Sequence, residues 1–537
     1  MNFLLLFKLL SRIVFLIAAT MVFSLPWAFP VIGGSAEFEF DGFFGLLGAI
    51  AIALIVGGFF WYLGRTATGS LYRKEAMAVV GLSWILATAI GAIPYLISRT
   101  EMAPGQVMQI WDACFESQSG FSTTGATVLT DVEMHDGEAL VPRSILFWRS
   151  STHFLGGMGI IVLFVAILGQ GSAGKTLMRS EIPGPTKDGP RTRVQQTAWI
   201  FATIYIVLTA VLSIFLACCG LSWFDSFCTS FGTMATGGFS TYDNSIGHFA
   251  QIPSVGPIGA AWAESIIMLF MVIAGTNFTL LYFMAIGKPL KLLQDVEWRT
   301  YIMTLFTVSL LILFFGYLNQ DHLFYYGENI WQSIASGIRQ SSFQVVSIMT
   351  TTGFSNSANF DEWNNFGRGT LLLLMFIGGC AGSTGGGLKV IRHIMFLSIM
   401  RLELEKSYHP TVVRPLRLGG QPVEDKNLRK NILVYFGLIL IIFVFSWLFL
   451  ITTEPDATWI RGGTGIEHMD HKLIDCASSV AATLNNVGPG LGTVGPKYTY
   501  TYFTPQAKIL FIWLMMVGRL EIFTIFVLFL PGFWRNQ

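Results

Sequence analysis

The stretch DACFESQSGFSTTG, from Asp112 to Gly125, decides the fold because the chain repeats its pattern three more times. The other copies are DSFCTSFGTMATGG (225–238), QSSFQVVSIMTTTG (340–353) and DCASSVAATLNNVG (475–488). In every copy a polar residue lies 13 positions before a glycine, and long apolar runs flank the copy. Four copies predict four short re-entrant helices whose glycines form a ring of backbone carbonyls, and such a ring can hold a bare cation.

The composition predicts a membrane protein with several spans. Of the 537 residues, 53% are hydrophobic and only 12% are charged, whereas a soluble protein carries about 25% charged residues. A spanning helix needs about 20 apolar residues. Ten such runs occur, at 13–33, 43–64, 76–97, 145–169, 197–219, 259–286, 300–318, 369–396, 431–452 and 508–532. The lipid bilayer is therefore the predicted environment, and the net charge of +1 gives no case for a nucleic-acid partner.

We expect an all-α polytopic fold of about ten transmembrane helices, with four pseudo-symmetric helix–pore-loop–helix repeats. One repeat cannot enclose a pathway, but four around one central pore can, because their non-helical backbone then lines water rather than lipid. The expected boundaries are 1–69 for two N-terminal transmembrane helices, 70–189 for pore repeat 1, 190–296 for pore repeat 2, 297–427 for pore repeat 3 and 428–537 for pore repeat 4.

The distribution of charge predicts the orientation. Lys and Arg gather in alternate loops, at 65–74, 175–193, 288–299 and 401–430, while the opposite loops are mainly acidic. By the positive-inside rule the basic loops are cytoplasmic. Ten spans then place both termini in the cytoplasm and all four glycine motifs outside, where acidic loops concentrate cations.

The four glycines and the residues just before them are the predicted filter. Glycine reaches the backbone angles that point successive carbonyls inward, and the neighbouring threonines can add carbonyl or hydroxyl oxygens. Ordinary extracellular turns would explain one TTG or TGG motif, but not four at equal spacing on one side. The predicted potassium-binding residues are Thr123, Thr124, Gly125, Thr236, Gly237, Gly238, Thr351, Thr352, Gly353, Asn486, Val487 and Gly488.

Glycines also interrupt the second long helix of each repeat. The third repeat is extreme, with GGCAGSTGGG at 378–387 inside an apolar run. Each glycine costs a helix about 1 kcal/mol relative to alanine, so we expect the helix to break there. In the first two repeats, close helix packing through small residues is the favoured interpretation. The predicted gate consists of Gly378, Gly379, Gly382, Ser383, Thr384, Gly385, Gly386, Gly387 and Arg519.

Charges inside the apolar runs have several interpretations. Arg519 lies in the middle of the last run, where a charge is expensive. It either makes a structural contact, with Glu521 or with carbonyls, or faces the pathway below the filter. Lys389 and Arg392 approach the cytoplasmic end, so snorkelling is the default for them. Glu264 is interpreted as interfacial.

The stretch GQGSAGKT, from Gly169 to Thr176, matches the phosphate-loop pattern G-x-x-x-x-G-K-[ST]. A phosphate loop joins a strand to a helix in a soluble sheet. Here the match follows an apolar run and precedes a basic loop, so we predict no nucleotide on this chain and no enzyme activity.

Several motifs together resemble the TrkH-type membrane subunit of the Trk/Ktr/HKT potassium-transporter superfamily. They are SGFSTTGAT (119–127), ATGGFSTYD (235–243), TTTGFSNS (350–357), NNVGPGLG (485–492), FWRSSTHFLGGMGII (147–161), EIPGPTKD (181–188) and GGCAGSTGGGLKVIR (378–392). The resemblance covers essentially the whole chain.

The resemblance implies a potassium transporter of the bacterial cytoplasmic (inner) membrane, gated by an intramembrane loop. It also implies a homodimer with one pore per subunit and a cytosolic nucleotide-binding regulatory ring. By position, Gly125, Gly238, Gly353 and Gly488 resemble the family's filter glycines, 378–387 its gating loop and Arg519 its last-helix arginine. In some plant relatives a serine replaces the first glycine and sodium is favoured, so Gly125 argues for potassium.

Two other classes of function stay open at this point. A coupled transporter for another solute would place a substrate site at the broken helices, but the spans offer few carboxylates. An ATP-driven enzyme would need the phosphate-loop match. The sequence leaves a channel and a proton- or sodium-coupled symporter equally open, and it gives segment 453–471 no role.

Overall fold

The computed structural model describes residues 1–35, 37–68, 72–135, 138–159, 194–319, 321, 330–409, 417–418, 421–422, 428–460, 471–520 and 522–534. These residues are mainly helical, as predicted, and their strands form only two-stranded antiparallel hairpins. The paired strands are β1 (Glu101–Ala103) with β2 (Gln106–Val107), β3 (Met134–His135) with β4 (Glu138–Ala139) and β5 (Arg417–Leu418) with β6 (Gln421–Pro422).

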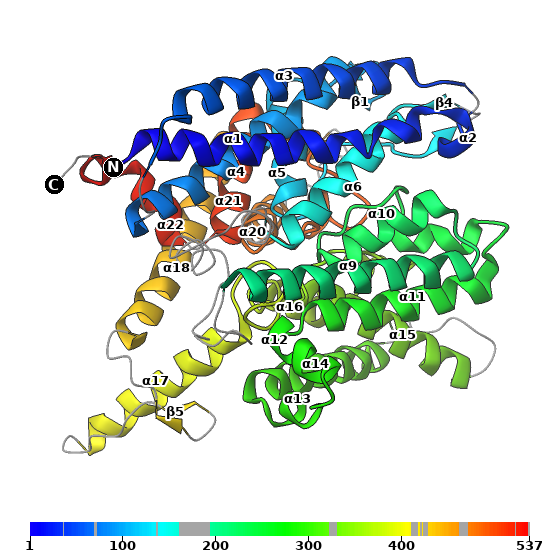
Figure 1. Cartoon of the computed structure of the whole chain (residues 1–537). Helices are drawn as coiled ribbons and strands as arrows, with labels where there is room; N and C mark the ends of the chain where they lie inside the picture. Colours follow the sequence, from blue (N-terminus) through cyan, green and yellow to red (C-terminus); the bar gives the residue numbers. More distant parts are fainter. Residues whose placement is uncertain are drawn as a thin grey trace.

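The first long helices, α1 (Phe3–Val22) and α3 (Phe40–Gly64), lie side by side along one flank of the molecule (Figure 1). The buried side chains of α1 recur every three or four residues, from Leu6 to Met21, which is the spacing of one helical face. The short helices η1 (Leu25–Ala28) and α2 (Pro30–Gly33) connect α1 to α3.

Repeats 1 and 2 each begin with a long helix and then a short one. Repeat 1 contains α4 (Arg73–Ile97), α5 (Ile110–Phe121) and α6 (Arg143–Gly157). Repeat 2 contains α9 (Val194–Cys218), α10 (Trp223–Met234), η2 (Ser245–Gln251), α11 (Gly256–Ala274), α12 (Phe278–Ala285) and α13 (Leu290–Gln294). Polar caps begin the short helices: Gln109 and Asp112 form a capping box at α5, and the Ser222 hydroxyl caps α10.

Repeats 3 and 4 follow the same order. Repeat 3 contains α14 (Val296–Leu318), α15 (Ile330–Met349), η4 (Phe360–Glu362), α16 (Asn365–Leu374) and α17 (Val390–Tyr408). Repeat 4 contains α18 (Leu428–Thr453), α19 (Ala457–Ile460), α20 (Lys472–Leu484), η6 (Gly492–Val494), α21 (Pro505–Arg519), α22 (Ile522–Phe526), η7 (Val527–Phe529) and α23 (Pro531–Trp534).

Of the described helices, seven are long and apolar enough to cross a membrane, at 3–28, 40–64, 74–97, 196–218, 256–274, 296–318 and 428–453. They are the two N-terminal helices, the first helix of each repeat, and α11. The predicted runs 369–396 and 508–532 are not single helices, because the chain leaves helical geometry inside each. Run 259–286 breaks after Ala274, and in run 145–169 helix α6 ends at Gly157.

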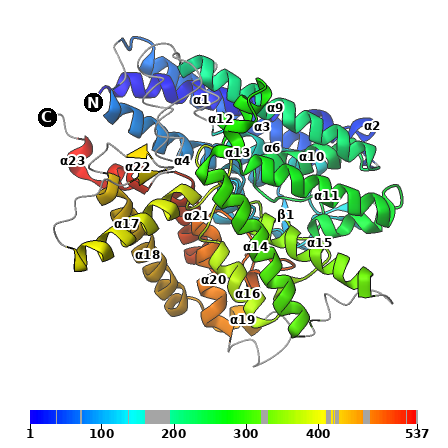
Figure 2. The same cartoon turned by 90° about the horizontal axis from the view of Figure 1, so that it is seen from below.

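Both termini lie at the end of the molecule where α17 and β5 project, and α2, β1 and β4 lie at the opposite end (Figure 1). Seen from below, α17 and α18 lie on one side of the molecule and α11 and α15 on the other (Figure 2). The buried side chains form two large clusters. One joins the N-terminal helices mainly to repeats 1 and 4, and the other lies mainly in repeats 2 and 3.

Candidate cation filter and intramembrane loop

The four short helices end in the same way. Helices α5, α10, α15 and α20 end four residues before Gly125, Gly238, Gly353 and Gly488. At each end, a backbone N–H donates to the carbonyl five residues earlier at 2.8–2.9 Å: Thr124 to Ser119, Gly237 to Gly232, Thr352 to Ser347 and Val487 to Ala482. This six-to-one hydrogen bond is characteristic of a Schellman cap. The same local backbone geometry therefore positions all four glycines.

The residue that each cap requires in the left-handed conformation is not glycine. Thr123, Thr236, Thr351 and Asn486 have φ values of 54°, 54°, 60° and 55°. A β-branched threonine at positive φ is an outlier, and strain of this kind gathers at functional sites. The filter glycines two residues later also have positive φ, from 76° to 98°. Alternate left-handed residues turn successive carbonyls to the same side of the chain, which a ring of oxygens requires.

The four segments form a closed ring. A methyl group built on Gly125 would strike the carbonyl oxygen of Gly237, and one on Gly238 would strike that of Thr352. Likewise, a methyl group on Gly353 would strike the carbonyl oxygen of Val487, and one on Gly488 would strike that of Thr124. Each carbonyl thus belongs to the residue just before the next repeat's glycine. The structure therefore brings together all the predicted filter residues around one axis.

The oxygens of this ring are neutral. Two hydroxyl pairs behind it repeat at equivalent positions: Ser122 with Thr124, and Thr350 with Thr352, each at 2.7 Å. Asn486 donates its amide to the Thr124 hydroxyl at 2.9 Å, which joins repeat 4 to repeat 1. Within the described residues no cluster of His, Cys, Asp and Glu could hold a metal ion. Any cation here would be bound by backbone carbonyls, not carboxylates.

The predicted break at 378–387 is present, and the loop between α16 and α17 packs against the inner side of the filter. Gly386 donates its N–H to the hydroxyl of filter residue Thr351 at 2.8 Å. Cys380 donates to the carbonyl of Gly275 at 2.9 Å, and Phe278 donates to that of Gly382 at 3.0 Å. The loop thus contacts the filter on one side and the break in repeat 2 on the other.

Arg519 is the last residue of α21 and contacts carbonyls, one of the predicted alternatives. Its Nη1 donates to Thr384 O of the loop at 2.6 Å. Its Nη2 donates to the carbonyls of Gly156 and Gly157 at the end of α6. One guanidinium therefore joins repeats 1, 3 and 4 just below the filter. The alternative partner, Glu521, lies outside the described residues.

Lys389 does not snorkel, so that interpretation was wrong. Its side chain is 1% exposed and donates to the carbonyls of Gly385 and Gly386. Glu264 is also buried, where it accepts a hydrogen bond from Asn356 at 2.8 Å. Asn356 lies 92 positions after Glu264 in the sequence, whereas the carbonyls that hold Lys389 lie only three and four positions before it, within the same loop.

Glu297 is a residue that the sequence analysis missed. It lies in the first turn of α14, and one carboxylate oxygen accepts the N–H groups of Ala381 and Ile391 at 2.7 and 3.1 Å. It therefore holds both sides of the loop at the start of α17. The available signal was a carboxylate in the first turn of a spanning helix.

The small residues of α6 do pack closely, as predicted. A methyl group on Gly156 would strike the carbonyl of Phe121, and one on Gly157 would strike Ala235. In repeat 1, Gly156 and Gly157 therefore allow α6 to pack against the C-terminal ends of α5 and α10. The chain leaves helical geometry at Gly159, which has φ 70°.

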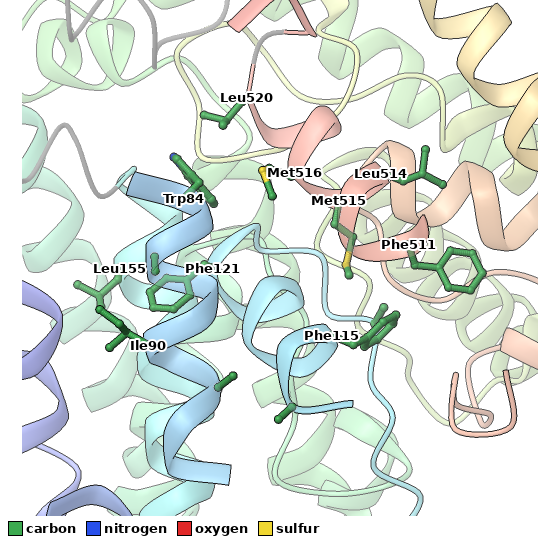
Figure 3. Packing of buried hydrophobic residues seen from close by; sticks show 14 of the residues in the cluster. Trp84, Ile90, Phe115, Phe121, Leu155, Phe511, Leu514, Met515, Met516 and Leu520 are labelled. Atoms are coloured by element: carbon green, nitrogen blue, oxygen red, sulfur yellow. The ribbon is translucent and has the colours of Figure 1, made fainter. Parts of the chain in front are cut away.

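A dense apolar cluster supports the filter from behind. Phe115 and Phe121 of α5 pack with Trp84 and Ile90 of α4 and with Phe511 and Met515 of α21 (Figure 3). All of these side chains are buried. Close packing of this kind resists small changes of shape, so the first pore helix is held between repeats 1 and 4. The phosphate-loop match (169–176) and most of segment 453–471 lie outside the described residues.

Comparison with known proteins agrees with this geometry. Residues 45–535 match the family model TrkH, described as "Cation transport protein". The chain is 37% identical over 491 residues to the Trk system potassium uptake protein TrkH of Escherichia coli (strain K12), covering 90% of this chain and 91% of that protein. It is 35% identical to the TrkH of Vibrio parahaemolyticus serotype O3:K6, with the same coverage.

A solved structure resembles the whole chain. The crystal structure of the potassium transporter TrkH from Vibrio parahaemolyticus superposes with a TM-score of 0.79 at 31% identity, and all of both chains is covered. The family consists of transport proteins, so the predicted absence of an enzyme activity is confirmed, and the chain is a multi-pass membrane protein. The chain belongs to the TrkH family of cation transport proteins.

Proposed function

We propose that this chain takes up potassium across the cytoplasmic membrane through the glycine-lined ring. The observation that supports this most strongly is the closed sequence of contacts in which each filter glycine lies against the carbonyl of the next repeat. Four neutral carbonyl segments can replace the hydration shell of a monovalent cation. The relatives named above are potassium uptake proteins, and Gly125 keeps the first ring position free of a side chain.

The loop 378–387 is the gate in this proposal. It lies against the filter, and Arg519, Lys389 and Glu297 hold it through backbone groups. Such a loop can take two arrangements of similar energy, because its glycines allow many backbone conformations. A cytosolic regulatory ring that binds a nucleotide would shift the balance from the inner side, so the chain itself would need no nucleotide.

The proposed assembly is a homodimer in the bacterial inner membrane, with one pore per subunit and both termini cytoplasmic. The projecting helix α17, which carries Arg401 and Lys406, lies at the same end as the N-terminus (Figure 1), which agrees with the positive-inside rule. The proposed domains are the two N-terminal helices (1–69) and the four pore repeats that begin at 70, 190, 297 and 428.

Replacing Gly125 by Ser tests the filter. The backbone at Gly125 has φ 78° and a Cβ there would strike the Gly237 carbonyl, so the variant should distort the ring and lower the preference for potassium over sodium by about tenfold. The measurement is rubidium uptake into proteoliposomes in competition with potassium or sodium. An unchanged preference in a folded, transporting variant would remove Gly125 from the filter. A second series with an imposed proton gradient separates channel-like from coupled uptake.

A further inference from the structure

A buried ion pair lies between filter segment 1 (residues 123–128) and filter segment 2 (residues 236–241), and it contacts the end of each that follows the glycine. Glu116 of α5 is 0% exposed and Arg149 of α6 is 3% exposed, and Arg149 Nε donates to Glu116 Oε1 at 2.6 Å. We call Glu116 and Arg149 the filter clamp. Its two charges belong to different helices of repeat 1, and each charge contacts a different filter segment.

Glu116 holds the segment that follows Gly125. Its Oε1 accepts the hydroxyl of Thr127 at 2.9 Å, and its Oε2 accepts the N–H of Val128 at 3.0 Å. These residues come two and three positions after the first filter glycine. Hydrogen bonds to a carboxylate are about twice as strong as neutral ones, so the exit of filter segment 1 is fixed to its own pore helix.

Arg149 holds the segment that follows Gly238. Its Nη1 donates to the carbonyl of Ser240 at 2.9 Å, and its guanidinium carbon lies 3.6 Å from the centre of the Phe239 ring. His153, one turn later on α6, stacks on the same ring at 4.1 Å. A methyl group on Gly237 would strike the His153 ring. Arg149 therefore contacts filter segment 2 both at the Ser240 carbonyl and at the Phe239 ring, and His153 stacks on that ring as well.

The other repeats fix the same position without such a charge pair. The third residue after the filter glycine is bound to its own pore helix in every repeat: Val128 to Glu116, Thr241 to Asp225, Asn356 to Gln344 and Leu491 to Ser478. At the position of Glu116, nine residues before the glycine, the other repeats have Thr229, Gln344 and Ser479. In repeats 3 and 4 a neutral hydrogen bond is therefore enough to hold the segment, whereas repeat 2 uses the carboxylate of Asp225.

A buried ion pair is costly, because desolvation opposes its Coulomb attraction. Local fixing alone does not require it, as repeats 3 and 4 demonstrate. What distinguishes the clamp is its reach: one connected group contacts the exits of two adjacent filter segments. The spacing of these segments sets the distance between carbonyls on one side of the ring, and a ring that fits potassium differs from one that fits sodium by a few tenths of an ångström in radius.

We propose that Glu116 and Arg149 are specificity-determining residues, which set the potassium preference by fixing the spacing between filter segments 1 and 2. They act through the backbone and do not touch the ion. This inference rests on the proposed function, because it takes the ring to be the filter.

The test compares two ion pairs of the full-length protein in proteoliposomes. The clamp variant is Glu116→Gln with Arg149→Met, which removes both charges and leaves no unpaired ion in the interior. The control is Asp112→Asn with Lys508→Met. That pair is also buried and also 2.6 Å long, but it joins repeat 1 to repeat 4 at the start of α5, and neither of its charged side chains hydrogen-bonds to a filter segment directly. Rubidium uptake is measured in competition with potassium and with sodium, and melting temperature is measured in detergent.

The clamp variant should transport rubidium with potassium-over-sodium preference lowered about tenfold, or about 1.4 kcal/mol. The control should keep the wild-type preference, whatever the change in its melting temperature. A wild-type preference in the folded clamp variant would overturn the proposal, and so would an equal loss of preference in the control. Wild-type protein without rubidium uptake or potassium preference would instead refute the proposed function itself.

Arg149→Lys keeps the proposal testable if the double variant does not fold. Lysine keeps the charge but lacks the planar fork that reaches Glu116 and Ser240 together. We expect this variant to fold and to lose about threefold in preference, less than the double variant. A folded lysine variant with unchanged preference would contradict the clamp.

Discussion

At the filter, the four repeats have one backbone geometry: the same Schellman cap, the same left-handed residue and a glycine at the same offset. Their second helices are all different. Helix α6 ends at Gly157, α11 gives way to α12 within three residues, α16 and α17 are separated by a long glycine loop, and α21 ends at Arg519. A ring of equivalent oxygens requires symmetry, whereas one loop is enough to close one pore. In the proposed function, this difference assigns selection to the outer half and gating to the inner half.

The largest effect should come from filling the ring. We expect Gly353→Ala to lower rubidium uptake about 100-fold, because the new Cβ would strike the Val487 carbonyl and the backbone has φ 76°. The matched control is Gly369→Ala in the same repeat, where a Cβ meets nothing within 4 Å. Alanine suits that helix, so its uptake should equal the wild type. Equal uptake by both variants would contradict the argument that the ring needs a glycine at each of its four equivalent positions.

The next effect concerns the gate. Arg519→Ala removes the donors that hold Thr384, Gly156 and Gly157. We expect basal rubidium flux to rise about tenfold, which corresponds to about 1.4 kcal/mol in the balance between closed and open. The potassium preference should persist, because the ring is not changed. Deleting several residues of 378–387 should act in the same direction.

Flux into liposomes at matched protein density decides this prediction, with Arg519→Lys as the variant that keeps a cation at the same position. If the alanine and deletion variants both insert and conduct no more than the wild type, the inner half is structural. The gate would then lie elsewhere.

The smallest effect separates stability from transport. Asp361 lies in η4, outside the spans, and accepts the N–H of Gly492 at 3.0 Å. Burial, with Asp475 nearby, raises the pKa of Asp361 from 3.8 to about 6. The folded state therefore binds this proton more tightly than the unfolded state, so its contribution is largest below about pH 4 and is lost as pH rises through about 6.

Asp361→Asn should therefore flatten the fall in melting temperature between pH 4 and pH 7, by an amount equivalent to about 1–3 kcal/mol. Asparagine still accepts from Gly492 and carries no charge. Rubidium uptake at pH 7.5 should change less than in the variants above. A pH profile of melting identical to that of the wild type would contradict the assigned burial of this carboxylate.

The symmetric part of the molecule could be predicted from the sequence, because a local pattern encodes it. The cap, the left-handed residue (threonine in three copies, Asn486 in the fourth) and the glycine lie within a few residues of one another in every copy. The break at 378–387 was equally visible, since glycines occupy every face of that helix. Glycines also mark the other breaks, at Gly159, Gly275 and Gly518, but close packing was the favoured interpretation in the first two repeats. In the fourth, Leu520 leaves the helix at ψ 149°, two residues after Gly518.

The contacts that join the repeats could not be predicted from local patterns. Asn486 and Thr124 are 362 positions apart, and Arg519 reaches Gly156 over a similar separation. The role of Glu297 depends on backbone 84 and 94 positions later in the same repeat. Spacing within one repeat contains no information about these partners, whereas the fold determines them.

The central claim is that four filter segments form one cation site, and anomalous diffraction tests it most directly. Crystals of the full-length protein grown in rubidium should give an anomalous peak on the axis between the carbonyls of Thr124, Gly237, Thr352 and Val487. Potassium should displace it at lower concentration than sodium does. Rubidium bound elsewhere in the protein, with no peak inside this ring, would contradict the account.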